Sequence, residues 1–521
     1  MRVVIVGGGP VGLMAACELR LYGIEAVVLE RRTDIDPTVK AGAIQARGVA
    51  ALDRRGLAER VREAGGQGLR EFETLMRNSG LRGHFSGMFV LRESNYGGEW
   101  MLPVAQQRLE EVLNERAIEL GVDVRREYVV REWRQDPEGV TLVVADMTAG
   151  SGADVQDRLY ELRADWLIGA DGGRSEIRKG GAFAFPGTDG VITAYQAIAE
   201  LDDPDFVPLG WNRCVGGMVV NGPNPGRLLM VGFDGPPADR DAPVTREELQ
   251  AALRRISGTE VGIRSITTVT RFTDNARQAD TYRDGRVLLA GDAAHIHSPF
   301  GGQGLNLGLG DAVNLGWKLA LVALGRAPET LLDTYTAERH PVAARVLDNT
   351  RAQVALMRPG PHTEALRGIF ARLVEHDDAN RWLSDMMGGT DVRYEVGSDL
   401  DVVGRFCPDL VVRTAHGADE ADGPGGADGT VRLAERLRSG RGQLLVLDAP
   451  DTPESPDAAQ WIKAASGWGD RVEVTVGTCA DAPSRALLVR PDGFVAWVAE
   501  SEQGLEEALG RWFGPADPGA M

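Results

Sequence analysis

The chain has 521 residues, of which 43 % are hydrophobic and 26 % charged, and its formal net charge is -19 at pH 7. This length indicates about two to four domains, and the composition is ordinary for a soluble globular protein. The acidic excess argues against nucleic-acid and anionic-membrane partners, because both require positive surface.

The four cysteines are scattered along the chain and form no C-x-x-C pair. This usage excludes a disulfide scaffold and a cysteine zinc site, and it indicates a reducing compartment. The N-terminus leads directly into a short apolar strand rather than a signal peptide, and no stretch reaches the roughly 18 uninterrupted apolar residues of a membrane span. We therefore expect a cytoplasmic protein without a metal centre.

The first predicted elements form a β-α-β unit. Val3–Val6 is an apolar strand, a helix runs from about Pro10 to Tyr22 until Gly23 stops it, and Ala26–Leu29 is a second buried strand.

Further along the chain, apolar periodicity predicts a helix from Gln106 to Leu120. Short strands follow at Val122–Val124, Val129–Arg134 and Val140–Ala145, and a strand at 165–169 enters another glycine turn.

Residues 181–275 differ in composition, with many Gly/Pro turns and one clear helix at Arg246–Ile256, and they predict a β-rich insertion. The chain returns to a buried strand at Val287–Ala290 and a long helix that begins near Asn306. After about residue 396, an acidic glycine-rich loop at Gly417–Gly429 precedes a strand–helix–strand–strand–strand–helix order, which suits a separate α/β domain.

The first chemical motif is Gly7-x-Gly9-x-x-Gly12 between a strand and a helix. Gly7 allows the tight turn, Gly9 lets the backbone approach a pyrophosphate, and Gly12 lets the helix pack closely on the strand. The helix N-terminus offers free N–H groups to phosphates. Glu30, 18 residues after Gly12, is placed to accept hydrogen bonds from a ribose. This context favours a bound dinucleotide over a glycine turn without a ligand.

The second motif comprises Gly291–His295 and Pro299–Asn306, where a buried strand again feeds a glycine-rich turn that opens a helix. Asp292 could bind a polyol hydroxyl, and the backbone amides of the second stretch could face an anion or a ring carbonyl. His295 and His297 could instead be catalytic, but no nucleophile or metal-ligand spacing accompanies them. We predict packing or capping for both, and no catalytic side chain.

With the segment ADWLIGADGGRSEIR at residues 164–178, these stretches make a set of three. In order and spacing they resemble the motifs of class A flavoprotein monooxygenases, typified by para-hydroxybenzoate hydroxylase. Residues 164–178 resemble the family's DG motif, which serves both FAD and NADPH. Residues 490–497 (RPDGFVAW) resemble the thioredoxin-like domain of the subgroup that includes rifampicin monooxygenases and aromatic polyketide hydroxylases.

The resemblance implies an α/β fold with a Rossmann-like FAD-binding domain of the glutathione-reductase type in two parts, 1–180 and 276–395. It also implies an inserted β-sheet substrate domain at 181–275, to whose site residues 75–105 contribute, and a thioredoxin-like domain without C-x-x-C at 396–521.

The resemblance also assigns FAD contacts. Glu30 and Arg31 would contact the adenosine part, Gln106 the flavin's linker, and Asp292 the ribityl or pyrophosphate region. The pyrophosphate would lie against Gly7, Gly9 and Gly12, and the ring against Pro299, Gly301, Gly302, Gly304, Leu305 and Asn306.

Lys40 stands where the family usually has arginine. A lysine keeps the positive charge but loses the bidentate fork. The contact with NADPH and the mobility of the flavin at this position are therefore in question, and Arg47 is a candidate for partial compensation.

The activity implied is that of a monooxygenase with non-covalent FAD, which NADPH reduces as a transient co-substrate and O₂ converts to a C4a-hydroperoxide. One oxygen would enter a large, flat, polyketide-like aromatic molecule in the biosynthesis or inactivation of an antibiotic or other natural product. Hydroxylation and Baeyer–Villiger insertion both stay open, and a monomer or homodimer is expected. Candidate wall residues, each of which could instead be plain core, are Phe85, Phe89, Trp100, Trp211, Met218, Met230 and Phe233.

A non-redox enzyme on the same scaffold is the main alternative, with FAD as a structural group and the pocket shaping a cyclisation such as a [4+2] closure. A flavin-dependent halogenase is disfavoured because the W-x-W-x-I-P motif, which is typical of those enzymes, is absent. Nothing in the sequence favours a flavin-bound regulator.

Overall fold

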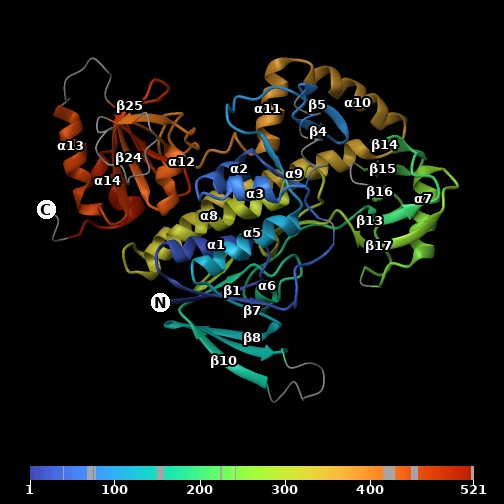
Figure 1. Ribbon diagram of the computed structural model, residues 1–521, viewed down its shortest axis with the longest axis horizontal. Coiled ribbons are helices and arrows are strands. Elements are labelled where there is room, and N and C mark those ends of the chain that lie inside the picture. Colours follow the sequence, from blue (N-terminus) through green and yellow to red (C-terminus); the bar gives the residue numbers. More distant parts are fainter. Residues whose placement is uncertain are drawn as a thin grey trace.

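The computed structural model describes residues 1–38, 40–66, 74, 78–148, 158–222, 226–240, 242–414, 429–447 and 456–517. A central α/β domain lies between two others: a green β-rich domain to its right, and the orange and red C-terminal domain to its left (Figure 1). Of the predicted loop Gly417–Gly429, only Gly429 belongs to the described residues.

The central sheet has six strands in the order β19-β20-β11-β1-β2-β7. β1 pairs in parallel with β2 on one side and with β11 on the other, so the strand order reverses at β1. In open α/β sheets, ligands bind beyond the carboxyl ends of the strands at such a point. The strands are β1 (Arg2–Val6), β2 (Glu25–Glu30), β7 (Asp123–Arg126), β11 (Trp166–Gly169), β19 (Arg283–Asp284) and β20 (Val287–Leu289).

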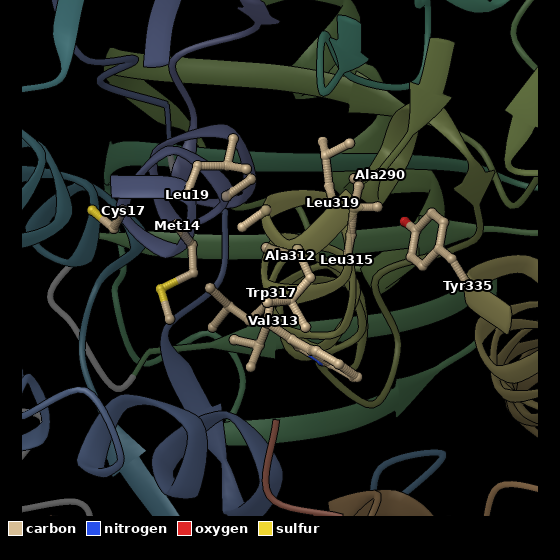
Figure 2. Packing of buried hydrophobic residues seen from close by; sticks show 14 of the residues in the cluster. Met14, Cys17, Leu19, Ala290, Ala312, Val313, Leu315, Trp317, Leu319 and Tyr335 are labelled. Atoms are coloured by element: carbon tan, nitrogen blue, oxygen red, sulfur yellow. The ribbon is translucent and has the colours of Figure 1, made fainter. Parts of the chain in front are cut away.

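Two helices from opposite ends of this domain make its core. α1 (Pro10–Leu21) packs so closely on α8 (Gly304–Ala323) that a Cβ at Gly316 would lie 2.3 Å from the Cβ of Glu18. Apolar side chains of both helices interdigitate, with Met14, Leu315 and Trp317 among them (Figure 2). Neighbouring elements are α2 (Ala46–Asp53), α3 (Ala58–Ala64), α5 (Gln106–Glu119), α6 (Glu176–Gly180) and the sheet β8 (Tyr128–Asp136), β9 (Gly139–Asp146) and β10 (Leu159–Ala164).

The β-rich insertion is an antiparallel sheet of five strands in the order β14-β15-β16-β13-β17. α7 (Arg246–Ser257) covers one face; the Thr245 hydroxyl caps its N-terminus by accepting from the Glu248 N–H, and Gly258 ends it with φ +75°. The strands are β13 (Thr193–Leu201), β14 (Gly210–Cys214), β15 (Gly217–Asn221), β16 (Arg227–Gly232) and β17 (Ile263–Phe272).

A helical layer beside the insertion consists of α9 (Asp333–Met357), α10 (Pro361–Val374) and α11 (Asp377–Gly388). The hairpin of β4 (Gly83–Phe85) and β5 (Met88–Leu91) packs on α10 and α11 through the apolar cluster of Phe85, Leu91, Val374, Leu383 and Met387. The remaining short strands are β3 (Ala43–Gln45), β6 (Met101–Pro103), β12 (Gly187–Thr188), β18 (Ala276–Gln278) and β21 (His295–Ile296).

The C-terminal domain has a mixed sheet in the order β23-β22-β25-β24-β26-β27, in which only β24 and β25 run parallel. Its thioredoxin-like classification stays a prediction. The elements are β22 (Val411–Thr414), β23 (Thr430–Arg432), α12 (Leu433–Arg436), β24 (Gly442–Leu447), α13 (Pro456–Ala465), β25 (Val472–Thr478), β26 (Ala486–Val489), β27 (Val495–Val498) and α14 (Leu505–Phe513).

Buried ion pairs hold this domain against the centre. Arg490 donates to both Glu338 carboxylate oxygens, at 2.6 and 2.8 Å, and also pairs with Asp492. Lys318 reaches the same Glu338 at 2.8 Å from α8. All four side chains are buried, so the network is satisfied only when the domains are docked together.

The long periodic segments of the sequence are confirmed within about two residues, whereas α2, α3 and the β4–β5 hairpin were not predicted. The four cysteines are free thiols, and burial raises the pKa of Cys17 and Cys407 to about 12. Across the described residues, no helix combines the length and the apolar character needed to cross a bilayer. The same part of the chain contains no cluster of three or more His, Cys, Asp or Glu side chains able to hold a metal ion.

Candidate functional site

The glycines of the first motif divide into two kinds. Gly7 has φ +112°, and a Cβ there would lie 2.2 Å from the carbonyl oxygen of Ala170. A Cβ at Gly12 would lie 2.0 Å from the carbonyl oxygen of Gly7, so both positions are closed by neighbouring backbone. Gly9 precedes α1, and a Cβ atom placed on it would have no other atom within 4 Å. An open space therefore lies at the N-terminus of α1, where a pyrophosphate fits.

Glu30 is fixed at the end of β2 by two backbone donors. Its carboxylate accepts from the Gly8 N–H at 2.7 Å and from the Arg32 N–H at 2.9 Å. Each oxygen has a further lone pair, so the carboxylate can also accept from a ribose hydroxyl. The loop-holding role of Glu30 was not predicted from the sequence, and the neighbouring Arg31 is exposed.

The three motifs meet at the start of α1. Gly291 follows β20 with φ +62°, and a Cβ there would lie 3.0 Å from Val11. Arg178 of the third motif donates to the carbonyl oxygen of Ala293 at 2.8 Å. Asp292 lies in the same turn, and its side chain is exposed to solvent.

The loop before α8 is clamped to the strand β3. Gln45 donates its side-chain amide to Gly301 O at 2.7 Å and its backbone N–H to the Asn306 side-chain oxygen at 2.8 Å. The Asn306 amide also donates to Gly302 O at 3.0 Å. The Asn306 side chain thus holds the loop in shape, and its direct contact with the ring stays a prediction. Gly301 and Gly302 have positive φ, so this loop requires glycine.

Lys40 forms an ion pair with Asp36 at 3.0 Å and is 47 % exposed. Gln106 begins α5, and its N–H donates to Ala41 O at 3.0 Å, which ties α5 to the segment after Lys40. Arg47 lies over the rings of Phe406 and Phe494 in the C-terminal domain. The suggestion that Arg47 compensates for the lysine was therefore wrong, because α2 turns its side chain toward another domain.

Arg227 is a cation that sequence reasoning did not single out. It comes from the start of β16, and its Nη1 would lie 3.5 Å from a Cβ atom placed on Gly42. A positive charge from the insertion thus reaches the segment after Lys40. Burial lowers the pKa of Arg227, but a guanidinium stays charged at neutral pH.

Aromatic and sulfur-containing side chains gather where the insertion meets the Pro299–Gly304 loop. Trp211, Met218 and Phe233 belong to one apolar cluster with Phe300, whose ring centroid is 6.4 Å from that of Trp211. His84, also not predicted, lies 4.4 Å from Trp211 and 5.5 Å from Phe89 by ring centroid. Burial lowers the pKa of His84 to about 4, so it is neutral at physiological pH.

The structure places the other three candidate wall residues elsewhere. Phe85 stacks on Phe370 of α10 with centroids 5.1 Å apart, and Trp100 packs on α11 while donating to Arg82 O at 2.9 Å. Met230 is fully buried on the opposite face of the sheet, in the cluster that packs against α7. Their packing does not support a place in the wall, which stays a prediction for these three residues.

His295 is part of a buried packing network. Its Nε2 lies 2.7 Å from Asp311, which also accepts from the Gly291 N–H at 3.1 Å and from Arg339 Nε at 2.8 Å. Asp311 thereby connects the second motif to α9. His297 has its Nδ1 2.7 Å from Ser298 O. These contacts agree with packing roles for both histidines.

Comparison with known proteins decides the family. Residues 1–350 match the family described as "FAD binding domain", and residues 401–516 match "Aromatic-ring hydroxylase, C-terminal". The chain belongs to the FAD-binding aromatic-ring hydroxylases. It is an FAD-dependent monooxygenase, and its central domain binds FAD.

Relatives of this monooxygenase align over nearly the whole chain. It is 41 % identical to 12-dehydrotetracycline 5-monooxygenase/anhydrotetracycline 6-monooxygenase of Streptomyces rimosus, covering 98 % of this chain and 99 % of the relative. It is 38 % identical to rifampicin monooxygenase of Streptomyces venezuelae and 36 % identical to dialkyldecalin synthase of Streptomyces rugosporus, each over 99 % of both chains. The solved structure of the anhydrotetracycline hydroxylase from Streptomyces rimosus superposes with a TM-score of 0.84 at 39 % identity, covering 99 % of this chain and 100 % of that one.

Proposed function

We propose that this monooxygenase transfers one oxygen atom from O₂ to a large, flat, polyketide-type aromatic substrate, with NADPH as the transient reductant. The observation that carries the proposal is the aromatic cluster around Trp211 and Phe300, which lies directly against the Pro299–Gly304 loop. Flat aromatic ligands bind well between aromatic rings, because stacked and edge-to-face contacts add to the burial of apolar area.

We propose that FAD is held non-covalently at the junction of the three motifs. The open space at Gly9 would take the pyrophosphate, Glu30 the adenosine ribose and Asp292 the ribityl chain. Gln106 would contact the linker, and the loop clamped by Gln45 would hold the ring. The closed positions Gly7 and Gly12 support this arrangement, because they let the start of α1 pack closely on the turn after β1.

Bound FAD would accept a hydride and activate O₂, so the polypeptide's work is positioning, charge and exclusion of water. Lys40 and Arg227 supply positive charge to the segment around Gly42. Neutral His84 and the apolar rings keep the substrate side dry. No acid–base pair is needed in this scheme.

The relatives support a role in natural-product chemistry. By name, one acts on tetracycline intermediates and another on rifampicin. We propose that this protein modifies a polycyclic molecule of comparable size, in its biosynthesis or inactivation.

A second candidate is a cyclase that keeps FAD as a structural group. Its support is the similarity to dialkyldecalin synthase and the lysine at position 40. In that case, conversion of substrate would require neither O₂ nor NADPH.

The deciding experiment follows anhydrotetracycline and a panel of aromatic polyketides in ¹⁸O₂ with NADPH, and in parallel without oxygen and reductant. A product carrying one ¹⁸O atom, formed only in the first condition, supports the proposal. Full conversion in the second condition refutes the oxygen-transfer proposal for that substrate and favours the cyclase.

A further inference from the structure

A cavity lies between the central domain and the C-terminal domain, away from the substrate cluster. Side chains of α2, α8 and α9, the end of α11 and the segment 492–494 line it, and it encloses about 70 Å³. The α2 and α12 helices lie side by side in this region (Figure 1). A single water needs roughly 10–15 Å³ on this scale, so the cavity holds about five non-hydrogen atoms.

Arg47 lines this cavity and has no counter-ion in the part of the chain that the structure describes. Its guanidinium lies 3.3 Å from the Phe406 ring centroid, and its Nη1 is covered without a hydrogen-bond partner. Arg54, two helical turns along α2, covers the same ring at 3.6 Å and also has a buried Nη1 without a partner. Two guanidinium groups thus share one aromatic ring.

The nearby carboxylates are already paired with other cations. Asp492 pairs with Arg490, and Asp53 and Asp409 both pair with Arg432. Two arginines of the lining are paired as well, Arg339 with Asp311 and Arg345 with Asp391. None of these acids forms an ion pair with Arg47 or Arg54 among the described residues.

Two neighbouring guanidinium groups without a carboxylate partner destabilise the folded protein, because their charges repel each other and have lost part of their hydration. Burial, together with the charge of Arg54, lowers the pKa of Arg47 to about 9. Guanidinium groups nevertheless stay charged at neutral pH, and cation–π contacts compensate only partly for lost hydration. Arg47 is half-buried and its Nη1 is fully covered, and charges withdrawn from water in proteins are usually paired, so an anion from solution would complete the pairing.

We propose that this cavity binds one small oxyanion, an inorganic phosphate or a small carboxylate, that pairs with Arg47. The guanidinium fork suits either anion, because both present two oxygens at matching spacing. Of the residues assigned to FAD, only Asn306 touches the cavity, so the site is separate from that of the pyrophosphate. Bound there, the anion would stabilise the contact between α2 and the C-terminal domain.

The test measures binding of radiolabelled inorganic phosphate and of acetate, separately, by equilibrium dialysis of FAD-saturated protein at constant ionic strength. Wild type is expected to bind one of these anions saturably at about one per chain. Saturation with FAD closes the pyrophosphate site, and an unchanged flavin spectrum shows that FAD stays bound. The anion that binds more tightly identifies the class.

Arg47→Met removes the charge at similar volume and is expected to weaken binding at least tenfold. Arg47→Lys keeps the charge without the fork and is expected to bind with intermediate affinity, which decides the matter if Arg47→Met does not fold. The matched control is Arg134→Met on β8, where the arginine is 63 % exposed, and it should bind as wild type does. In anion-free buffer, the Tm of Arg47→Met should equal or exceed that of wild type, because an unpaired, half-buried charge has been removed.

Two results would overturn the proposal. One is the absence of saturable binding of both probes to wild type. The other is equal binding by wild type and the Arg47 variants, which would place the anion elsewhere.

Discussion

Gly9→Ala offers a direct test of the proposed pyrophosphate site. Gly9 has φ -78°, which any residue adopts, and a Cβ atom placed on it would have no protein atom within 4 Å. The new methyl group therefore meets nothing in the protein and should leave the Tm of the apo-protein unchanged. If the pyrophosphate lies in that space, the methyl group displaces it from the N–H groups at the start of α1.

The expected magnitude depends on how many hydrogen bonds the displaced pyrophosphate can no longer accept. A hydrogen bond to a charged group is worth about 1.5–3 kcal/mol, so breaking one such bond raises the Kd for FAD by roughly 10- to 150-fold. Gly12→Ala is the contrasting variant, because its Cβ would lie 2.0 Å from backbone. It should destabilise the apo-protein itself by about 1–3 kcal/mol.

Two measurements separate these effects: thermal unfolding of both apo-variants, and titration of each with FAD followed by flavin fluorescence. Unchanged FAD affinity in Gly9→Ala would refute the placement of the pyrophosphate. A loss of apo-protein stability in the same variant would refute the structural argument that the space is empty of protein.

Glu30→Ala should lower FAD affinity roughly ten- to hundredfold in titrations of apo-protein, since it removes a charged acceptor. Lys40→Ala should slow reduction by NADPH in anaerobic stopped flow but not by dithionite, while Lys40→Arg keeps the rate. Met218→Ala should raise the KM for the substrate, whereas Met230→Ala, on the other face of the sheet, should lower Tm with KM unchanged. Burial raises the pKa of Glu110 to about 7, so its stabilising contribution is full below about pH 4.5 and is lost as pH rises to 7. The Tm of Glu110→Gln minus the Tm of wild type should therefore increase as the pH is raised from 5 to 8.

Local features of the fold could be predicted because their causes are local. The helix predicted at Arg246–Ile256 is observed at Arg246–Ser257, since apolar periodicity and the glycine that follows mark its extent. Gly12 is closed by the backbone of Gly7 in the same motif, as their spacing predicted. In each case, residues close in sequence determine the geometry.

The choice of face in the inserted sheet could not be predicted. Met218 and Met230 lie on adjacent antiparallel strands, but the register pairs Met218 with Val231 and Val219 with Met230. Since successive side chains alternate between faces, the two methionines point to opposite sides. The sequence GMVVN of β15 is apolar on both faces, so no alternation distinguishes the substrate side from the side of α7.

Docking of the C-terminal domain depends on residues far apart in the chain, so the segment RPDG alone does not indicate it. Arg490 and Asp492 meet Glu338 and Lys318 in a buried network. Removal of one member leaves an uncompensated buried charge, typically at a cost of about 3–5 kcal/mol, so any other docking arrangement is strongly disfavoured. Because Lys318 lies on α8, whose first turn carries the clamped loop, the position of the C-terminal domain and the shape of the proposed flavin site are set by one helix.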